Sequence, residues 1–190
     1  LSSDTAVGIT KSLGLATIGF GDAYNRLKPD IVVLLGDRYE ILAAAQAALI
    51  IGLPIAHIAG GDTTEGAFDE AIRHSISKMA HIHFVTNELS ARRVRQLGEN
   101  PHYIFNVGSP GIDYIKRVHL INRNDLEQEL GYRFQDKNLL VTFHPVTLDS
   151  VSSTEQMAEL LTALDSLGKG VGVIFTKANA DTQGRSINQM

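Results

Sequence analysis

Short apolar runs alternate with longer segments of helical spacing along the first half of the chain. Apolar side chains recur at helical intervals, with Pro or Gly where the pattern stops, and predict helices over four ranges: 4–27, 38–51, 68–80 and 88–97. Runs rich in Val, Ile and Phe predict strands over four ranges between and after them: 30–36, 54–59, 81–86 and 103–107. The first of these runs is almost entirely apolar, so we expect that strand to be buried on both faces.

The pattern changes after the fourth predicted strand. Residues 110–130 keep a helical pattern but are rich in charge, and we expect them to form a helical bridge out of a first domain. The earlier rhythm then restarts, with strands predicted over 138–143 and 171–175 and a helix over 154–167. Strands that alternate with helices predict the α/β class, with doubly wound parallel sheets and right-handed crossovers. The predicted domains are residues 1–115 and 116–190.

Composition narrows the function classes. The 190 residues include 44% hydrophobic and 20% charged side chains, which is typical of a folded globular protein. The net charge of −4 leaves no basic excess for a nucleic-acid backbone, so no nucleic-acid partner is expected. Cysteine is absent, which excludes thiolate nucleophiles and zinc–thiolate centres from the sequence.

The longest apolar stretch, residues 41–58, is interrupted by Gln46, Gly52, Pro54 and His57, so we expect no membrane span. No basic-then-apolar leader follows Leu1, and a cytoplasmic location is therefore expected. Because the sequence starts without Met and stops at Met190 inside a predicted helix, we expect it to be an internal piece of a longer protein.

Polar residues follow the predicted strands, at the sheet edge where open α/β folds bind ligands. They lie near or after the ends of strands in both predicted domains: Asp37, Arg38, His57, Asp62, His144, Lys177, Asn179 and Asp181. Each could be structural; Asp37 in particular could cap the helix that starts near Arg38, a role compatible with catalysis. Arg38 could hold a phosphate bidentately or be an ordinary surface residue. As a set they indicate a binding crevice.

The helix over 68–80 opens with Asp69 and Glu70, which its dipole favours on structural grounds alone. Glu70, Arg73 and His74 also share one helical face, at spacings of three and four residues. A carboxylate beside an Arg and a His has a tunable proton affinity, as a general acid or base requires.

Four histidines are candidate metal ligands: His57, His74, His81 and His83. Their positions give no His-Glu-x-x-His spacing and no cysteine joins them, so we expect no metal site.

Five segments taken together, in order along nearly the whole chain, resemble the hydrolysing UDP-N-acetylglucosamine 2-epimerases of bacterial sialic acid synthesis. They are Gly36–Glu40, His57–Asp62, Phe68–His74, Lys78–His81 and Phe143–Thr147. The resemblance implies two Rossmann-like sheets in the glycosyltransferase-B arrangement, both incomplete in this chain. It implies conversion of UDP-N-acetylglucosamine and water into UDP and N-acetylmannosamine, without cofactor or metal, by a homodimer or tetramer.

The same resemblance assigns roles to individual residues. Asp37 and Glu70 are implied as catalytic acid and base, and Asp62 joins them because some relatives carry a carboxylate where this chain has Ala59. The implied substrate-binding residues lie in both domains: Arg38, His57, Asp69, Arg73, His74, His144 and Asn179.

Three other functions stay open at this point. The same chemistry could act on a UDP-diacetamido-trideoxy sugar of the legionaminic acid route. A glycosyltransferase of the same architecture would instead need an acceptor. A non-catalytic piece would only fold or associate. Because the resemblance places the family's opening strand before Leu1 and a nucleotide-binding loop after Met190, we expect the chain alone to be inactive.

Overall fold

The computed structural model describes residues 5–146, 151–179 and 183–190. The predicted helix start at Asp4, the last residue of the Phe143–Thr147 segment and the strand-end residue Asp181 lie outside the described residues. Internal contacts divide the chain into two compact units, Leu1–Lys116 and Arg117–Met190, whereas the sequence pattern predicts a boundary after residue 115.

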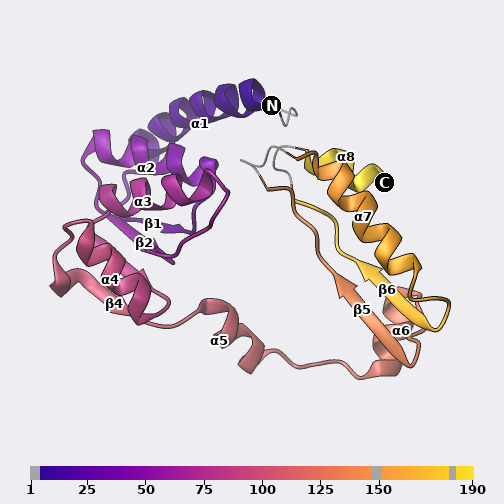
Figure 1. The fold of residues 1–190 in the computed structure, drawn as a ribbon. Coiled ribbons are helices and arrows are strands. Elements are labelled where there is room, and N and C mark those ends of the chain that lie inside the picture. Colours follow the sequence, from indigo (N-terminus) through magenta and orange to yellow (C-terminus); the bar gives the residue numbers. More distant parts are fainter. Residues whose placement is uncertain (1–4, 147–150, 180–182) are drawn as a thin grey trace. The chain divides into compact units, whose positions relative to one another are not determined.

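The first unit is built on four parallel strands that lie side by side in the order in which they occur in the chain. The strands are β1 (Val32–Leu35), β2 (Ile55–Ile58), β3 (Ile82–Val85) and β4 (Ile104–Asn106). The crossover helices are α2 (Tyr39–Ile51), α3 (Asp69–Met79) and α4 (Glu88–Gln96), with α1 (Ala6–Leu27) before β1 and a 3₁₀ turn, Pro101–Tyr103, before β4. The prediction of an α/β fold with parallel sheets is confirmed (Figure 1).

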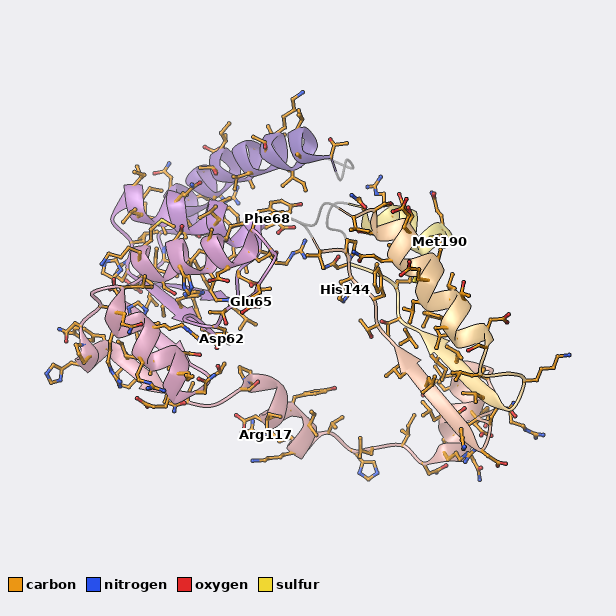
Figure 2. The ribbon with its side chains drawn as sticks, in the orientation of Figure 1. Asp62, Glu65, Phe68, Arg117, His144 and Met190 are labelled. Atoms are coloured by element: carbon orange, nitrogen blue, oxygen red, sulfur yellow. The ribbon has the colours of Figure 1, made fainter. Side chains whose placement is uncertain are left out.

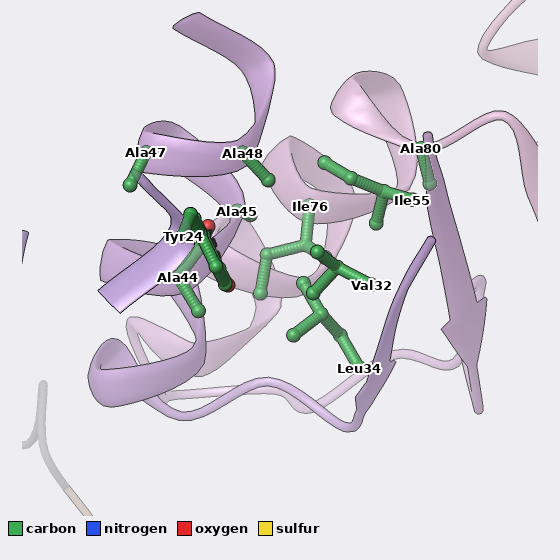
Figure 3. Packing of buried hydrophobic residues seen from close by; sticks show 10 residues of the cluster. All are labelled: Tyr24, Val32, Leu34, Ala44, Ala45, Ala47, Ala48, Ile55, Ile76 and Ala80. Atoms are coloured by element: carbon green, nitrogen blue, oxygen red, sulfur yellow. Dashed lines mark hydrogen bonds between the residues drawn. The ribbon is translucent and has the colours of Figure 1, made fainter. Parts of the chain in front are cut away.

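The core of this unit lies between the sheet and its helices (Figure 3). Val32 and Leu34 of β1 pack with Ile55 of β2 and Ile76 of α3. The side of α2 that meets them is built from alanines, which let the helix approach the sheet closely: Ala44, Ala45, Ala47 and Ala48. The Tyr24 hydroxyl of α1 donates to the Ala44 carbonyl at 3.4 Å, which fastens α1 along α2.

The expectation that β1 is buried on both faces is wrong. Val33 and Leu35 are 60% and 56% exposed, whereas Val32 and Leu34 are in the core. When each strand pairs with its predecessor, right-handed crossovers place α2, α3 and α4 on the same face of the sheet. The opposite face, which we call the open face, carries two apolar rows: Val33–Ala56–Ile82 and Leu35–Ile58–Phe84–Phe105.

Residues 110–130 are largely helical, as expected, but the helix is interrupted. The structure has two helices there, α5 (Pro110–Arg117) and α6 (Arg123–Leu130). The Asn122 side chain accepts a hydrogen bond from the Asp125 N–H at 3.0 Å, so Asn122 is the N-cap of a new helix rather than part of a continuous one.

The second unit contains one parallel strand pair, β5 (Lys137–Val141) and β6 (Val171–Phe175). Helix α7 (Ser153–Asp165) connects them, and the short helix α8 (Gly184–Gln189) follows β6. Among the described residues of both units, no helix is long and apolar enough to cross a membrane.

Candidate functional site

An ion pair connects the carboxyl end of β1 to the middle of α3. The Arg73 guanidinium donates to the Asp37 carboxylate, and both side chains are largely buried, at 11% and 22% exposure. Arg73 also donates to the Asp62 carbonyl at 2.9 Å and to the Thr64 hydroxyl at 3.0 Å. One side chain therefore fixes Asp37 against the loop over residues 60–66 that leads from β2 into α3.

Glu70 lies on the same helix and meets the same loop. One carboxylate oxygen accepts a hydrogen bond from the Thr64 N–H at 3.2 Å, and the other lies 3.7 Å from His74 Nε2. At 36% exposure, the Glu70 side chain remains open to solvent. The structure thus brings together four of the predicted residues, which we call the carboxylate cluster: Asp37, Glu70, Arg73 and His74.

Asp62 lies on the loop from β2 to α3, where Figure 2 labels it together with Glu65 and Phe68. Its carboxylate faces α4. It accepts hydrogen bonds from the Thr86 hydroxyl, the Ser90 hydroxyl and, at 3.4 Å, the Asn87 amide. Gly61 allows this close approach: its φ is +83°, and a Cβ there would lie 2.4 Å from the Ser90 carbonyl oxygen. The geometry of Asp62 is that of a loop anchor.

His57 of β2 is fully buried beneath this loop. Its Nε2 lies 2.7 Å from the Gly36 carbonyl, which can only accept, so Nε2 carries the proton. Its Nδ1 lies 3.0 Å from the Ser77 hydroxyl and accepts from it. The resemblance implies that His57 binds substrate, but in this unit the ring is enclosed and both its nitrogens bind protein groups.

Burial lowers the pKa of His57 to about 4, because a charged ring would lose its hydration. The hydrogen bond to the Gly36 carbonyl opposes this shift. The positive charges of neighbouring groups, including Arg73, add to it. In the unfolded chain the ring titrates near its ordinary value of 6.5. Between those two pKa values the unfolded state binds more protons than the folded state. The contribution of neutral His57 to the free energy of unfolding is therefore fully present above about pH 6.5 and is lost as the pH drops toward 4.

We therefore expect the free energy of unfolding to fall by about 2 kcal/mol between pH 7 and pH 5 through His57 alone. Urea unfolding followed by circular dichroism at the two pH values measures this. His57→Gln keeps a side-chain N–H but cannot titrate, and should remove that part of the pH dependence. His102→Gln, at an exposed position, should leave it unchanged. An equal pH dependence in the wild type and in His57→Gln would contradict the assignment.

The sequence left two roles open for Asp37. The N-cap position of α2 belongs to Arg38, without a side-chain capping bond, so the alternative in which Asp37 caps this helix is wrong. The Arg38 side chain bonds to Glu40 at 3.3 Å and lies over the Tyr39 ring, so its phosphate-binding role stays a prediction. Asp69 is the first residue of α3, and its role in substrate binding also stays a prediction.

The two predicted residues of the second unit meet each other. The Asn179 N–H donates to His144 Nδ1 at 3.1 Å, joining the segments that follow β6 and β5. His144 is exposed there.

Sequence reasoning missed the hydroxyl groups that hold the site. Thr64, Ser77, Thr86 and Ser90 are all hydrogen-bonded to predicted site residues. Isolated Ser and Thr form no spacing motif. Only Thr64 lies close to the Gly60-Gly61 pair in the sequence, so nothing in the pattern indicated Ser77, Thr86 or Ser90.

Comparisons with known proteins show what the whole chain is similar to. The sequence model of the family described as UDP-N-acetylglucosamine 2-epimerase matches residues 1–190. The chain is 44% identical over all 190 residues to a protein of Campylobacter jejuni described as GDP/UDP-N,N'-diacetylbacillosamine 2-epimerase (hydrolyzing), and covers 49% of it. It is 36% identical over 182 residues (96% of this chain) to UDP-N,N'-diacetylbacillosamine 2-epimerase (hydrolyzing) of Legionella pneumophila, covering 48% of that protein.

Among solved structures, the fold is similar to UDP-GlcNAc 2-epimerase from Neisseria meningitidis bound to UDP-GlcNAc. The TM-score is 0.75 at 18% identity, over 98% of this chain and 52% of that one. The chain therefore spans about half the length of the curated relatives that it matches.

Proposed function

Because the chain belongs to the UDP-N-acetylglucosamine 2-epimerase family, we propose that the full-length protein is a hydrolysing 2-epimerase of a UDP-linked 2-acetamido sugar. The reaction releases UDP and a free sugar with inverted configuration at the carbon that bears the acetamido group. The observation that supports this most directly is the carboxylate cluster, where Asp37 and Glu70 are both held by groups of α3 and its preceding loop.

The chemistry requires two proton transfers at one carbon. A carboxylate removes the proton from C2 while the C1–O bond breaks and its electron pair leaves with UDP, which gives a glycal. Water then adds across the double bond: its oxygen bonds to C1, and C2 receives a proton from the opposite face. Asp37 and Glu70 are suited to these transfers, because a carboxylate can both accept and donate a proton. Arg73 balances the negative charge of the ionised Asp37.

Two substrates are candidates. The relatives from Campylobacter jejuni and Legionella pneumophila favour UDP-N,N'-diacetylbacillosamine, which belongs to the diacetamido route considered above. UDP-N-acetylglucosamine, with N-acetylmannosamine for sialic acid synthesis as the product, is the second candidate, and the description of the family favours it. We propose that the full-length protein acts in the cytoplasm as a homodimer or tetramer, with no cofactor.

Proton NMR of the full-length protein turning over each UDP-sugar in heavy water tests the reaction. We expect the released sugar to carry deuterium at C2, because the proton removed by the carboxylate exchanges with solvent before water adds. The substrate with the higher kcat/KM identifies the specificity. Product that retains its original hydrogen at C2 would contradict elimination, and UDP release that requires an added acceptor would favour a transferase.

A further inference from the structure

His57 lies beneath the carboxylate cluster without belonging to it, and its hydrogen bonds reach the backbone beside Asp37. The Gly36 carbonyl that accepts from His57 Nε2 belongs to the peptide group that joins Gly36 to Asp37. The orientation of this peptide plane sets the direction in which the Asp37 side chain leaves the backbone. A bond that fixes the carbonyl therefore restricts where the Asp37 side chain starts, and the Arg73 guanidinium then holds its carboxylate.

Gly36 is attached to β2 at both of its polar groups. Its N–H donates to the Ile58 carbonyl at 3.0 Å, and its carbonyl accepts from His57. The φ of Gly36 is +86°, a conformation that the residue adopts at little cost but that does not by itself restrict the next peptide. The two bonds to β2 supply that restriction.

Helix α3 controls both ends of this arrangement. Arg73 and Ser77 lie four residues apart, on one face of the helix. Arg73 holds the Asp37 carboxylate, while the Ser77 hydroxyl donates to His57 Nδ1 and so keeps the proton on Nε2. Ser77 is completely buried, so bulk solvent does not compete with His57 for its hydroxyl.

We propose that His57 is a positioning residue for Asp37, acting through the Gly36 carbonyl, with Ser77 fixing the orientation and tautomer of its ring. This role rests on the proposed function, since Asp37 matters most if it transfers a proton. It differs from the substrate contact that the sequence implied for His57.

Gly60 offers an independent way to disturb the pair. A Cβ at this position would lie 2.7 Å from the Ser77 hydroxyl oxygen and 2.9 Å from His57 Nδ1. Its φ is outside the left-handed region, so Gly60→Ala acts by displacing these two side chains rather than by straining its own backbone.

The test compares Ser77→Ala and Gly60→Ala with Ser75→Ala in the full-length enzyme. Ser75 lies on the same helix, is exposed, and donates to the Ala71 carbonyl of that helix at 2.7 Å. We expect Ser77→Ala and Gly60→Ala to lower kcat about tenfold with KM changed less than about twofold, because a displaced carboxylate slows chemistry more than binding. Ser75→Ala should match the wild type.

Nitrogen-15 NMR of the His57 ring supplies a measurement that needs no turnover. The wild type and Ser75→Ala should show Nε2 protonated, and Ser77→Ala a mixture of the two tautomers. An unchanged kcat in both Ser77→Ala and Gly60→Ala would overturn the proposal. So would a fall in kcat that is in proportion to a fall in the urea midpoint of unfolding, because the variants would then simply be less folded. If the wild type turns over neither UDP-sugar, the proposed function fails, and the ring tautomer in Ser77→Ala then decides this inference alone.

Discussion

Replacing Asp37 with Asn, or Glu70 with Gln, in the full-length protein is expected to lower turnover of the UDP-sugar by about 10²–10⁴-fold, the usual effect of losing a general acid or base. Each substitution keeps the size and shape of the side chain but removes its capacity to transfer a proton. The remaining amide can still accept from the Arg73 guanidinium or the Thr64 N–H, so the loop should stay in place. UDP release under saturating substrate measures kcat.

Glu88→Gln is the matched control for these two variants. Its carboxylate is 62% exposed on α4 and pairs with Arg95 at 2.9 Å, away from the carboxylate cluster. We expect this variant to keep wild-type turnover and all three variants to keep the circular dichroism spectrum. Turnover within a few-fold of wild type for both Asp37→Asn and Glu70→Gln would show that these carboxylates only hold the loop.

Replacing Arg73 with Met is expected to lower the free energy of unfolding by about 3 kcal/mol, because the Asp37 carboxylate then remains largely buried without its cation. The Asp62 carbonyl and the Thr64 hydroxyl lose their donor as well. Methionine keeps much of the volume, so the loss comes from charge and hydrogen bonding rather than from a cavity. Urea unfolding followed by circular dichroism measures it.

Arg92→Met, at an exposed position of α4, controls for the loss of one positive charge and should change stability by less than about 0.5 kcal/mol. The decrease in the free energy of unfolding caused by Arg73→Met should be smaller when Asp37→Asn is also present, because no unpaired buried carboxylate then remains. Equal stability of Arg73→Met and the wild type would show that the ion pair contributes nothing to the fold.

Much of this architecture could be predicted from the order of apolar and polar segments. Each of the six strands in the part of the chain that the structure describes overlaps a predicted range, although β5 starts one residue earlier, at Lys137. A short run rich in branched apolar residues has few alternatives to a strand. The break between α5 and α6 could not be predicted from periodicity, since both flanking segments are helical in pattern and the capping bond of Asn122 decides the matter. The exposed side of β1 depends on strand order, which a local pattern does not contain.

The candidate site was predictable in its residues but less so in their contacts. The spacing of Glu70, Arg73 and His74 indicated a shared helical face, and the structure places Glu70 beside His74. It did not indicate that Arg73 reaches back to Asp37 across the sheet edge. Whether a polar residue at a strand end faces outward or inward depends on tertiary packing, and His57 faces inward.

The strand order of the first unit has a consequence for how the chain folds. Each strand pairs with the one made just before it, so every pairing closes a loop of a single crossover: Val32 with Ile55, Ala56 with Ile82, and His83 with Ile104. The entropic cost of loop closure is therefore divided into small, similar steps, and among the four described strands no pairing must wait for a distant strand. A ribosome that releases the chain from its amino end delivers the strands in the order in which they add to the sheet, so assembly can keep pace with synthesis.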